Sequence, residues 1–271
     1  MKAVDVLNII DERSPFSAAC DWDNSGFQVG DKDQKVTKLL VALDLGDEVI
    51  EHACEMGADM IVTHHPLIFS PLKRVTSDDF IAGRVLKLIK NNIAYACAHT
   101  NYDIFGMAQL AADRLMLKDT EVLSVEDVTE LPEGVFGEQG IGRAGRIAEP
   151  ERLCEYAETV RETFGLSHVS YFGNPDTVIS KVACCPGSGK SVINDALYLK
   201  ADVLVTGDID HHSGIDATSR GLSIIDAGHY GIEHIFIKDM TDYLASRVDD
   251  GVEVVAEPLS FPINIVTGQE A

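Results

Sequence analysis

The chain has 271 residues, of which 22 are Lys or Arg and 44 are Asp or Glu, so its formal net charge is −22. A field of this sign repels polyanions, which argues against non-specific binding to nucleic acid or to an anionic membrane. Hydrophobic residues make up 45% of the chain, which is too much for an acidic disordered protein. The composition predicts an acidic globular protein and leaves room for a small anionic ligand at a local site.

The cysteines and the apolar segments favour a reducing, cytoplasmic environment. None of the six cysteines belongs to a CxxC pair, and several lie inside apolar runs, as small buried side chains do. The first residues contain no apolar signal core. No apolar stretch approaches the ~18 residues that a membrane-spanning helix needs. The cysteines are Cys20, Cys54, Cys97, Cys154, Cys184 and Cys185.

The first half of the chain alternates between helical and strand patterns. Residues 38–43 form a continuous apolar run, which is typical of a strand buried on both faces. Strand, helix, strand, helix, strand predicts right-handed crossovers and a mainly parallel sheet with helices on both faces. The predicted helices are 3–12, a segment around residues 49–56, 80–90 and 106–117, and the predicted strands are 38–43, 60–63 and 93–98.

The second half repeats this pattern. Residues 201–206 match residues 58–63 at an offset of 143, with four of six positions identical, and residues 221–227 correspond to 92–98. The order of the matching elements predicts a duplication, with two similar α/β units packed around a shared interface, where sites are often built. Further helices are predicted at 150–164 and 231–247.

The acidic, turn-rich start of residues 118–180 is the best linker in the sequence. We therefore predict one domain from residues 1–125 and 226–271, carrying most of the proposed ligands, and a second from residues 126–225.

Two adjacent histidines, His64 and His65, directly follow the predicted strand 60–63. The carboxyl edge of an α/β sheet is where sites are built. Neighbouring side chains on an extended backbone diverge, so the pair suits two neighbouring metals better than one. The alternative interpretation is a polar loop.

Two similar segments follow other predicted strands. His99 and Asp103 come after residues 93–98, and His229 and Glu233 come after residues 222–227. A helix beginning near His229 would place His229 and Glu233 one turn apart on one face. The alternatives are a helix-capping turn for the first pair, and a solvated histidine with a dipole-stabilising glutamate for the second.

Together the three segments supply three imidazoles and two carboxylates. His64, His65, Asp103, His229 and Glu233 fit two Zn²⁺, Mn²⁺ or Fe²⁺ ions with positions open to water. A metal pair lowers the pKa of bound water and stabilises both the attacking and the leaving oxygen in a displacement reaction. His99 is then a ligand, a partner of a ligand, or an acid/base group.

Two weaker motifs remain. The segment 186–191 resembles a phosphate-binding P-loop, but that motif needs glycine at position 184, where this chain has Cys184. The glycines Gly187 and Gly189 still suit a tight strand-to-helix turn. His211 and His212 could form an additional ligand cluster or a substrate-facing loop. By the repeat offset, Gly207 and Asp208 stand where the first half has His64 and His65.

Several motifs resemble a known family, the dinuclear-metal-centre proteins called GTP cyclohydrolase 1 type 2 homologs (Nif-three-like). The matching segments are 22–30, 41–44, 63–69, 99–103, 140–145, 206–208 and 226–233. The resemblance implies two intertwined α/β repeats and toroidal hexamers built from dimers. It implies the same five ligands, with Glu233 and Asp103 shared or bridging. Residues 118–180 are too short for the inserted domain that some members carry.

Two hypotheses of function follow. The first is a metal-dependent hydrolase acting on a nucleotide-like substrate, which for the family's named activity means opening the imidazole ring of GTP at C8 with release of formate. His99 is then the expected proton shuttle. The alternative is a non-catalytic metal-binding scaffold, carrier or adaptor.

Overall fold

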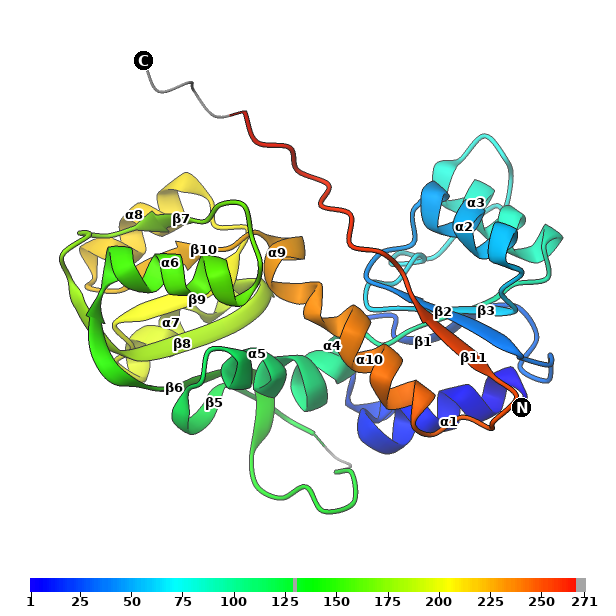
Figure 1. Cartoon of the computed structure of the whole chain (residues 1–271), viewed down its shortest axis with the longest axis horizontal. Helices are drawn as coiled ribbons and strands as arrows, with labels where there is room; N and C mark the ends of the chain where they lie inside the picture. Colours follow the sequence, from blue (N-terminus) through cyan, green and yellow to red (C-terminus); the bar gives the residue numbers. More distant parts are fainter. Residues whose placement is uncertain (129–130, 267–271) are drawn as a thin grey trace.

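The computed structural model describes residues 1–128 and 131–266 and shows two lobes, each built around one sheet (Figure 1). The first sheet has the strand order β1-β4-β3-β2-β11. Its four strands from β4 to β11 are parallel, and β1 runs antiparallel to β4. The strands are β1 (Gly26–Val29), β2 (Lys38–Ala42), β3 (Met60–Thr63), β4 (Ala94–Cys97) and β11 (Glu253–Ala256).

Helices cover both faces of this sheet, as predicted. Leu39 and Val41 of β2 pack into the same core as α1 and α10, whereas Leu40 between them packs into the core formed with α2 and α3. Successive side chains of a strand point to opposite faces, so a strand buried on both sides must be apolar throughout. The helices are α1 (Ala3–Arg13), α2 (Asp47–Met56), α3 (Phe80–Lys90) and α10 (Ile235–Ala245).

The second sheet has six strands in the order β5-β6-β8-β9-β10-β7. Only β8, β9 and β10 are mutually parallel, and the three outer strands are antiparallel to their neighbours. The predicted mainly parallel pattern therefore describes the first sheet and the centre of the second. The strands are β5 (Lys118–Glu126), β6 (Gln139–Arg152), β7 (Ser170–Phe172), β8 (Val178–Ser188), β9 (Val203–Gly207) and β10 (Ser223–Asp226).

The β5–β6 pairing places the start of residues 118–180, where the linker was predicted, partly within a strand. β5 runs to Glu126 and pairs with β6 over Lys118–Glu126, so residues 118–125 belong to the second sheet. Residues 129–130 of the predicted linker and residues 267–271 of the predicted first domain lie outside the described residues. The division into two domains stays a prediction.

The chain returns to the first sheet at its carboxyl end. After β10, the helices α9 (His229–Glu233) and α10 cross between the lobes, and β11 then pairs with β2 (Figure 1). The helices α6 (Leu153–Thr163), α7 (Ile193–Tyr198) and α8 (His211–Ser219) pack on the second sheet. Within the described residues, no helix is both long enough and apolar enough to cross a membrane.

The two halves resemble each other in their hydrogen bonds as well as in their sequence, because an equivalent aspartate makes the same bonds in each. The carboxylate of Asp59 accepts the backbone N–H groups of Thr37 and Lys38, at 2.7 and 3.0 Å. At the repeat offset, Asp202 accepts those of Ser180 and Lys181, both at 2.8 Å. In each half this aspartate stands just before a central parallel strand and fixes the start of its neighbour. The match supports the predicted duplication.

The close pairing of β5 with β6 depends on the absence of a side chain at Gly140. A Cβ atom there would collide with the carbonyl oxygen of Ser124 and touch Val122. We expect Gly140→Ala to lower the free energy of unfolding by at least about 2 kcal/mol, because backbone atoms cannot move aside cheaply. Gly251→Ala is the control, because a Cβ at Gly251 meets open space. Denaturant titration of both variants measures the difference, and equal stabilities would contradict this account.

Candidate metal centre

The site lies between the lobes, where the carboxyl ends of β3 and β4 face the start of α9. His64 and His65 follow β3, and His99 follows β4. Asp103 begins a π-helical turn, Asp103–Met107, that lies between α4 (Thr100–Tyr102) and α5 (Ala108–Arg114). Turns of this kind are frequent at functional sites.

All five predicted ligands come together, and Glu233 is shared between two groups of them. His64 Nε2 lies 3.4 Å from Asp103 Oδ1 and 3.7 Å from Glu233 Oε1. On the other side of the carboxylate, Glu233 Oε2 lies 3.1 Å from His65 Nε2 and 3.0 Å from His229 Nε2. The ligand atoms within each group lie within 4.8 Å of one another. α9 begins at His229, so His229 and Glu233 are one helical turn apart, as predicted.

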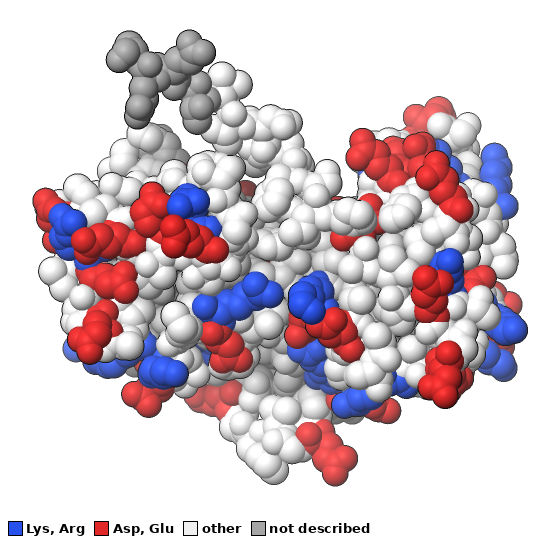
Figure 2. All heavy atoms as spheres, in the orientation of Figure 1, with Lys and Arg blue, Asp and Glu red and all other residues white. Residues whose placement is uncertain are grey.

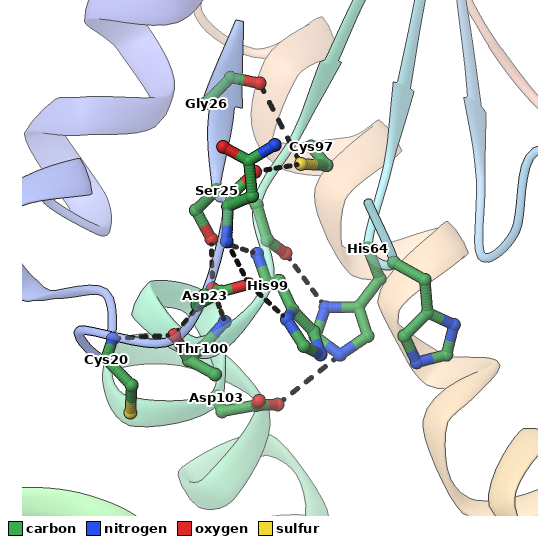
Figure 3. Close-up of polar contacts among 12 residues, drawn as sticks. Cys20, Asp23, Ser25, Gly26, His64, Cys97, His99, Thr100 and Asp103 are labelled. Atoms are coloured by element: carbon green, nitrogen blue, oxygen red, sulfur yellow. Dashed lines mark hydrogen bonds and ion pairs between the residues drawn. The ribbon is translucent and has the colours of Figure 1, made fainter. Parts of the chain in front are cut away.

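His99 stands beside these groups. Its ring nitrogen forms a third cluster with those of His64 and His65. The centroid of the His99 ring lies 5.2 Å from that of His64 and 5.5 Å from that of His65. Figure 3 shows His99 and Asp103 approaching His64 from neighbouring elements. His99 is therefore placed to act either on a ligand or on a molecule bound next to one.

The four histidines share one arrangement of hydrogen bonds. Each Nδ1 lies 2.7–2.8 Å from an oxygen acceptor. Donation from Nδ1 fixes the tautomer and leaves Nε2 with a free lone pair directed into the site. The acceptors are Ala98 O for His64, Asp44 for His65, Asp23 for His99 and Asp208 for His229. Figure 3 shows the Asp23–His99 pair.

The three aspartates were not among the predicted site residues. Asp44 and Asp208 each follow a strand of the parallel region, β2 and β9, at the same edge as the ligands. The strand-end rule that identified the histidines therefore also points to these two. Asp23 lies in the loop before β1, where no such rule applies.

Buried polar atoms at the centre lack hydrogen bonds. His64 is fully buried and Glu233 is 3% exposed. His64 Nε2 and Glu233 Oε2 have no hydrogen-bond partner, although imidazole nitrogens of His65 and His229 lie 3.1 and 3.0 Å from Glu233 Oε2. His65 Nε2 and His229 Nε2 are only 3.1 Å apart. Converging lone pairs of this kind are costly to bury without a partner, and a cation satisfies them together. The donor set of imidazoles and carboxylates fits Zn, Fe or Mn.

The charges of the site influence one another strongly. Burial raises the pKa of Glu233, but the neighbouring imidazoles of His229, His64 and His65 outweigh burial and hold that pKa well below its usual value. Burial lowers the pKa of His229, but Glu233 and Asp208 outweigh it and raise the pKa to about 9. An ionised glutamate surrounded by imidazoles is thus the favoured form in the metal-free protein.

The glycine-rich segment after β8 makes room for the centre. Gly187 has φ +75°, and a Cβ there would collide with Glu233 Oε1. A Cβ at Gly207, which takes the repeat position of His64, would press on the backbone of His229. Lys190 does not face the centre but pairs with Asp210 at 2.8 Å on the surface. The glycines therefore allow the backbone to lie close to the ligand side chains. They do not serve as the phosphate-binding glycines of a P-loop.

His211 and His212 do not join the site. They form the exposed first turn of α8, which Asp210 caps by accepting the N–H groups of His212 and Ser213. Neither belongs to any of the three groups that the described residues form. Of the two alternatives for this pair, the described residues therefore give no support to an additional ligand cluster, and the substrate-facing loop stays a prediction.

Fold and site together define an α/β protein with a buried histidine–carboxylate centre that could hold metal, set between two related lobes. A family model described as Duf34/NIF3 (NGG1p interacting factor 3) matches residues 1–260, so the chain belongs to this family.

Relatives named GTP cyclohydrolase 1 type 2 homolog match along almost the whole chain. The protein of Clostridium perfringens is 34% identical, covering 98% of this chain and 100% of the relative. That of Lactococcus lactis is 37% identical, covering 94% and 95%.

Solved structures show the same fold. A Bacillus cereus protein related to NIF3 has a TM-score of 0.90 and 26% identity, covering 98% of this chain and 99% of the other. Reduced HcgD from Methanocaldococcus jannaschii has a TM-score of 0.78 and 31% identity, covering 94% and 96%.

The turn that carries His64 and His65 is held by the buried hydroxyl of Tyr95 on β4. The hydroxyl donates to the His65 carbonyl at 2.9 Å, accepts the Leu67 N–H at 2.9 Å, and lies 2.7 Å from Thr63 Oγ1. One phenol thus fixes the backbone on both sides of the histidine pair.

We expect Tyr95→Phe to lower the free energy of unfolding by about 1–3 kcal/mol, because buried polar groups would lose their partner. Tyr198→Phe is the matched control, because Tyr198 is 84% exposed. Thermal unfolding of both variants measures the effect. A Tyr95→Phe protein as stable as the control would show that the hydroxyl does not support the turn.

Proposed function

We propose that this protein binds two divalent ions per chain, Zn, Fe or Mn, and acts as a metal-dependent hydrolase on a nucleotide-like substrate. The observation that carries the proposal is the position of Glu233, whose two oxygens face separate groups of ligands. One ion would be held by His64, Asp103 and Glu233, and the other by His65, His229 and Glu233. Such an arrangement suits a bridging carboxylate.

A bound metal pair supplies electrophilic activation and lowers the pKa of water. The chain's own residues supply orientation and proton transfer. Asp23 holds Nδ1–H of His99, so His99 Nε2 is free to accept a proton and later donate it. The Asp23 carboxylate has no exposed side-chain surface and also accepts hydrogen bonds from Ser25 and Thr100, which keeps the imidazole in place (Figure 3).

The relatives' name supports GTP as the first substrate to test. In the proposed reaction one water adds at C8 of the guanine base and the C8–N9 bond breaks, which leaves a formamide; a second water hydrolyses this formamide, so that C8 leaves as formate and an amine remains on the opened ring. The family resemblance further supports a homo-oligomer, a toroidal hexamer of dimers, and a small anionic substrate at the centre. Those assemblies and a cytoplasmic location stay predictions.

Metal content tests the centre. We expect the protein to take up two Zn²⁺ or Mn²⁺ ions per chain, and Glu233→Gln to lose at least one, because the neutral amide cannot bridge two cations. Glu155→Gln is the matched control, since Glu155 is exposed and pairs with Arg152. Mass spectrometry of the metals after dialysis gives the stoichiometry. Well under one metal per wild-type chain, with no uptake on soaking, would contradict the proposal.

Formate release tests the reaction. We expect metal-loaded protein to release formate from GTP, and His99→Ala to slow release by about 100-fold or more while keeping its metals, because it removes the proton shuttle. The control is His168→Ala, in which an exposed histidine outside the centre is removed. No formate above background with Zn, Fe or Mn would exclude the cyclohydrolase reaction and favour the metal-binding scaffold, carrier or adaptor.

A further inference from the structure

Two large aromatic side chains lie exposed beside His99. Trp22 is 60% exposed and Phe69 is 53% exposed. Their ring centroids are 6.1 Å apart, and the centroid of Trp22 lies 6.0 Å from that of His99 in an edge-on arrangement. Contiguous exposed apolar side chains mark interaction sites in soluble proteins, whereas hydrophobic side chains exposed singly carry no such meaning.

The loops that carry this pair are held in place by a shared set of hydrogen bonds. Asn24 Nδ2 donates to the carbonyl of Ile68 at 2.5 Å, and the Ile68 N–H donates to Gln28 Oε1 at 2.8 Å. These bonds join the loop of Trp22 to that of Phe69. Asp23, the neighbour of Trp22, is fixed to His99 and Thr100. The aromatic pair and the histidine are therefore preorganised together, which lowers the entropic cost of ligand binding.

Trp22 also lines a cavity of about 730 Å³ that opens between the loop 17–22 and the second sheet. This volume suits a small-molecule ligand. The described lining residues include the carboxylates of Asp21, Glu126 and Asp127 but no Lys or Arg. Such a cavity disfavours a phosphate chain and accepts a neutral or cationic group. On the face seen in Figure 2, basic side chains are interspersed with acidic ones.

We infer that Trp22 and Phe69 form a stacking platform for the planar heteroaromatic ring of the substrate, with the ring entering the acidic cavity and any phosphate directed away from it. Aromatic faces bind any base by stacking, without base-specific hydrogen bonds. The inference rests on the proposed function, because it assigns the ring end of the nucleotide-like substrate to one side of the centre.

Trp22 is the single tryptophan of the chain, so its fluorescence reports directly on this platform. The experiment titrates the metal-loaded, full-length protein with guanosine, with ribose 5-phosphate and with inorganic triphosphate. We expect saturable quenching by guanosine and none by the other two. Phe69→Leu should weaken guanosine binding about tenfold. Phe136→Leu is the matched control, because Phe136 is 86% exposed and lies on the β5–β6 connection.

Several outcomes would overturn the platform. These are no saturable change with guanosine, quenching by triphosphate instead, or a Phe69→Leu protein with unchanged affinity. A change of solution mass in Phe69→Leu, measured by light scattering, together with no response to guanosine, would assign the pair to a contact between copies of this chain. Circular dichroism of the variant checks that it is folded.

Measurements on the wild-type protein separate this inference from the proposed function. Quenching by guanosine in a protein that binds no metal or releases no formate supports the platform and rejects the hydrolase. Formate release from GTP without any response of Trp22 rejects the platform and leaves the hydrolase standing.

Discussion

One buried carboxylate, that of Glu233, organises the centre of this protein. It comes from the second half of the chain and lies against His64 and His65 of the first half. To place it there, β10 must end at the interface, α9 must begin at once, and the backbone at Gly187 must pass close to the carboxylate. Burying an ion in this way is expensive unless it is surrounded by compensating groups. The histidines, and metal ions in the proposed function, provide that compensation.

The duplication gives one asymmetric centre rather than two equal ones. Each half contributes a histidine and a carboxylate four residues apart after its third parallel strand, His99 with Asp103 and His229 with Glu233. The halves differ after the second strand, where His64 and His65 correspond to Gly207 and Asp208. Gly207 has no side chain to obstruct α9, and Asp208 accepts a hydrogen bond from His229. The second half thus supports ligands at positions where the first half supplies them.

The acidic composition also has a specific use at the centre. Asp23, Asp44 and Asp208 each hold the Nδ1–H of one histidine. Carboxylates in this position increase the basicity of the imidazole and fix its orientation. Most of the 44 acidic residues are still surface charge, and the net charge of −22 still opposes polyanions. The aromatic pair beside His99 would let an acidic protein recognise the uncharged end of a nucleotide-like molecule.

The sequence by itself determined the buried parallel strands, the helices between them and the five residues at the centre. Short continuous apolar runs between helical patterns are typical of strands buried on both faces, and the residues that follow parallel strands share one edge of the sheet. Only the tertiary structure decided the antiparallel pairing of β5 with β6, the position of His211 and His212 outside the centre, and the choice of Asp23 as the partner of His99. Asp23 and His99 are 76 residues apart. Contacts over such separations depend on how loops are placed by packing, which local periodicity does not encode.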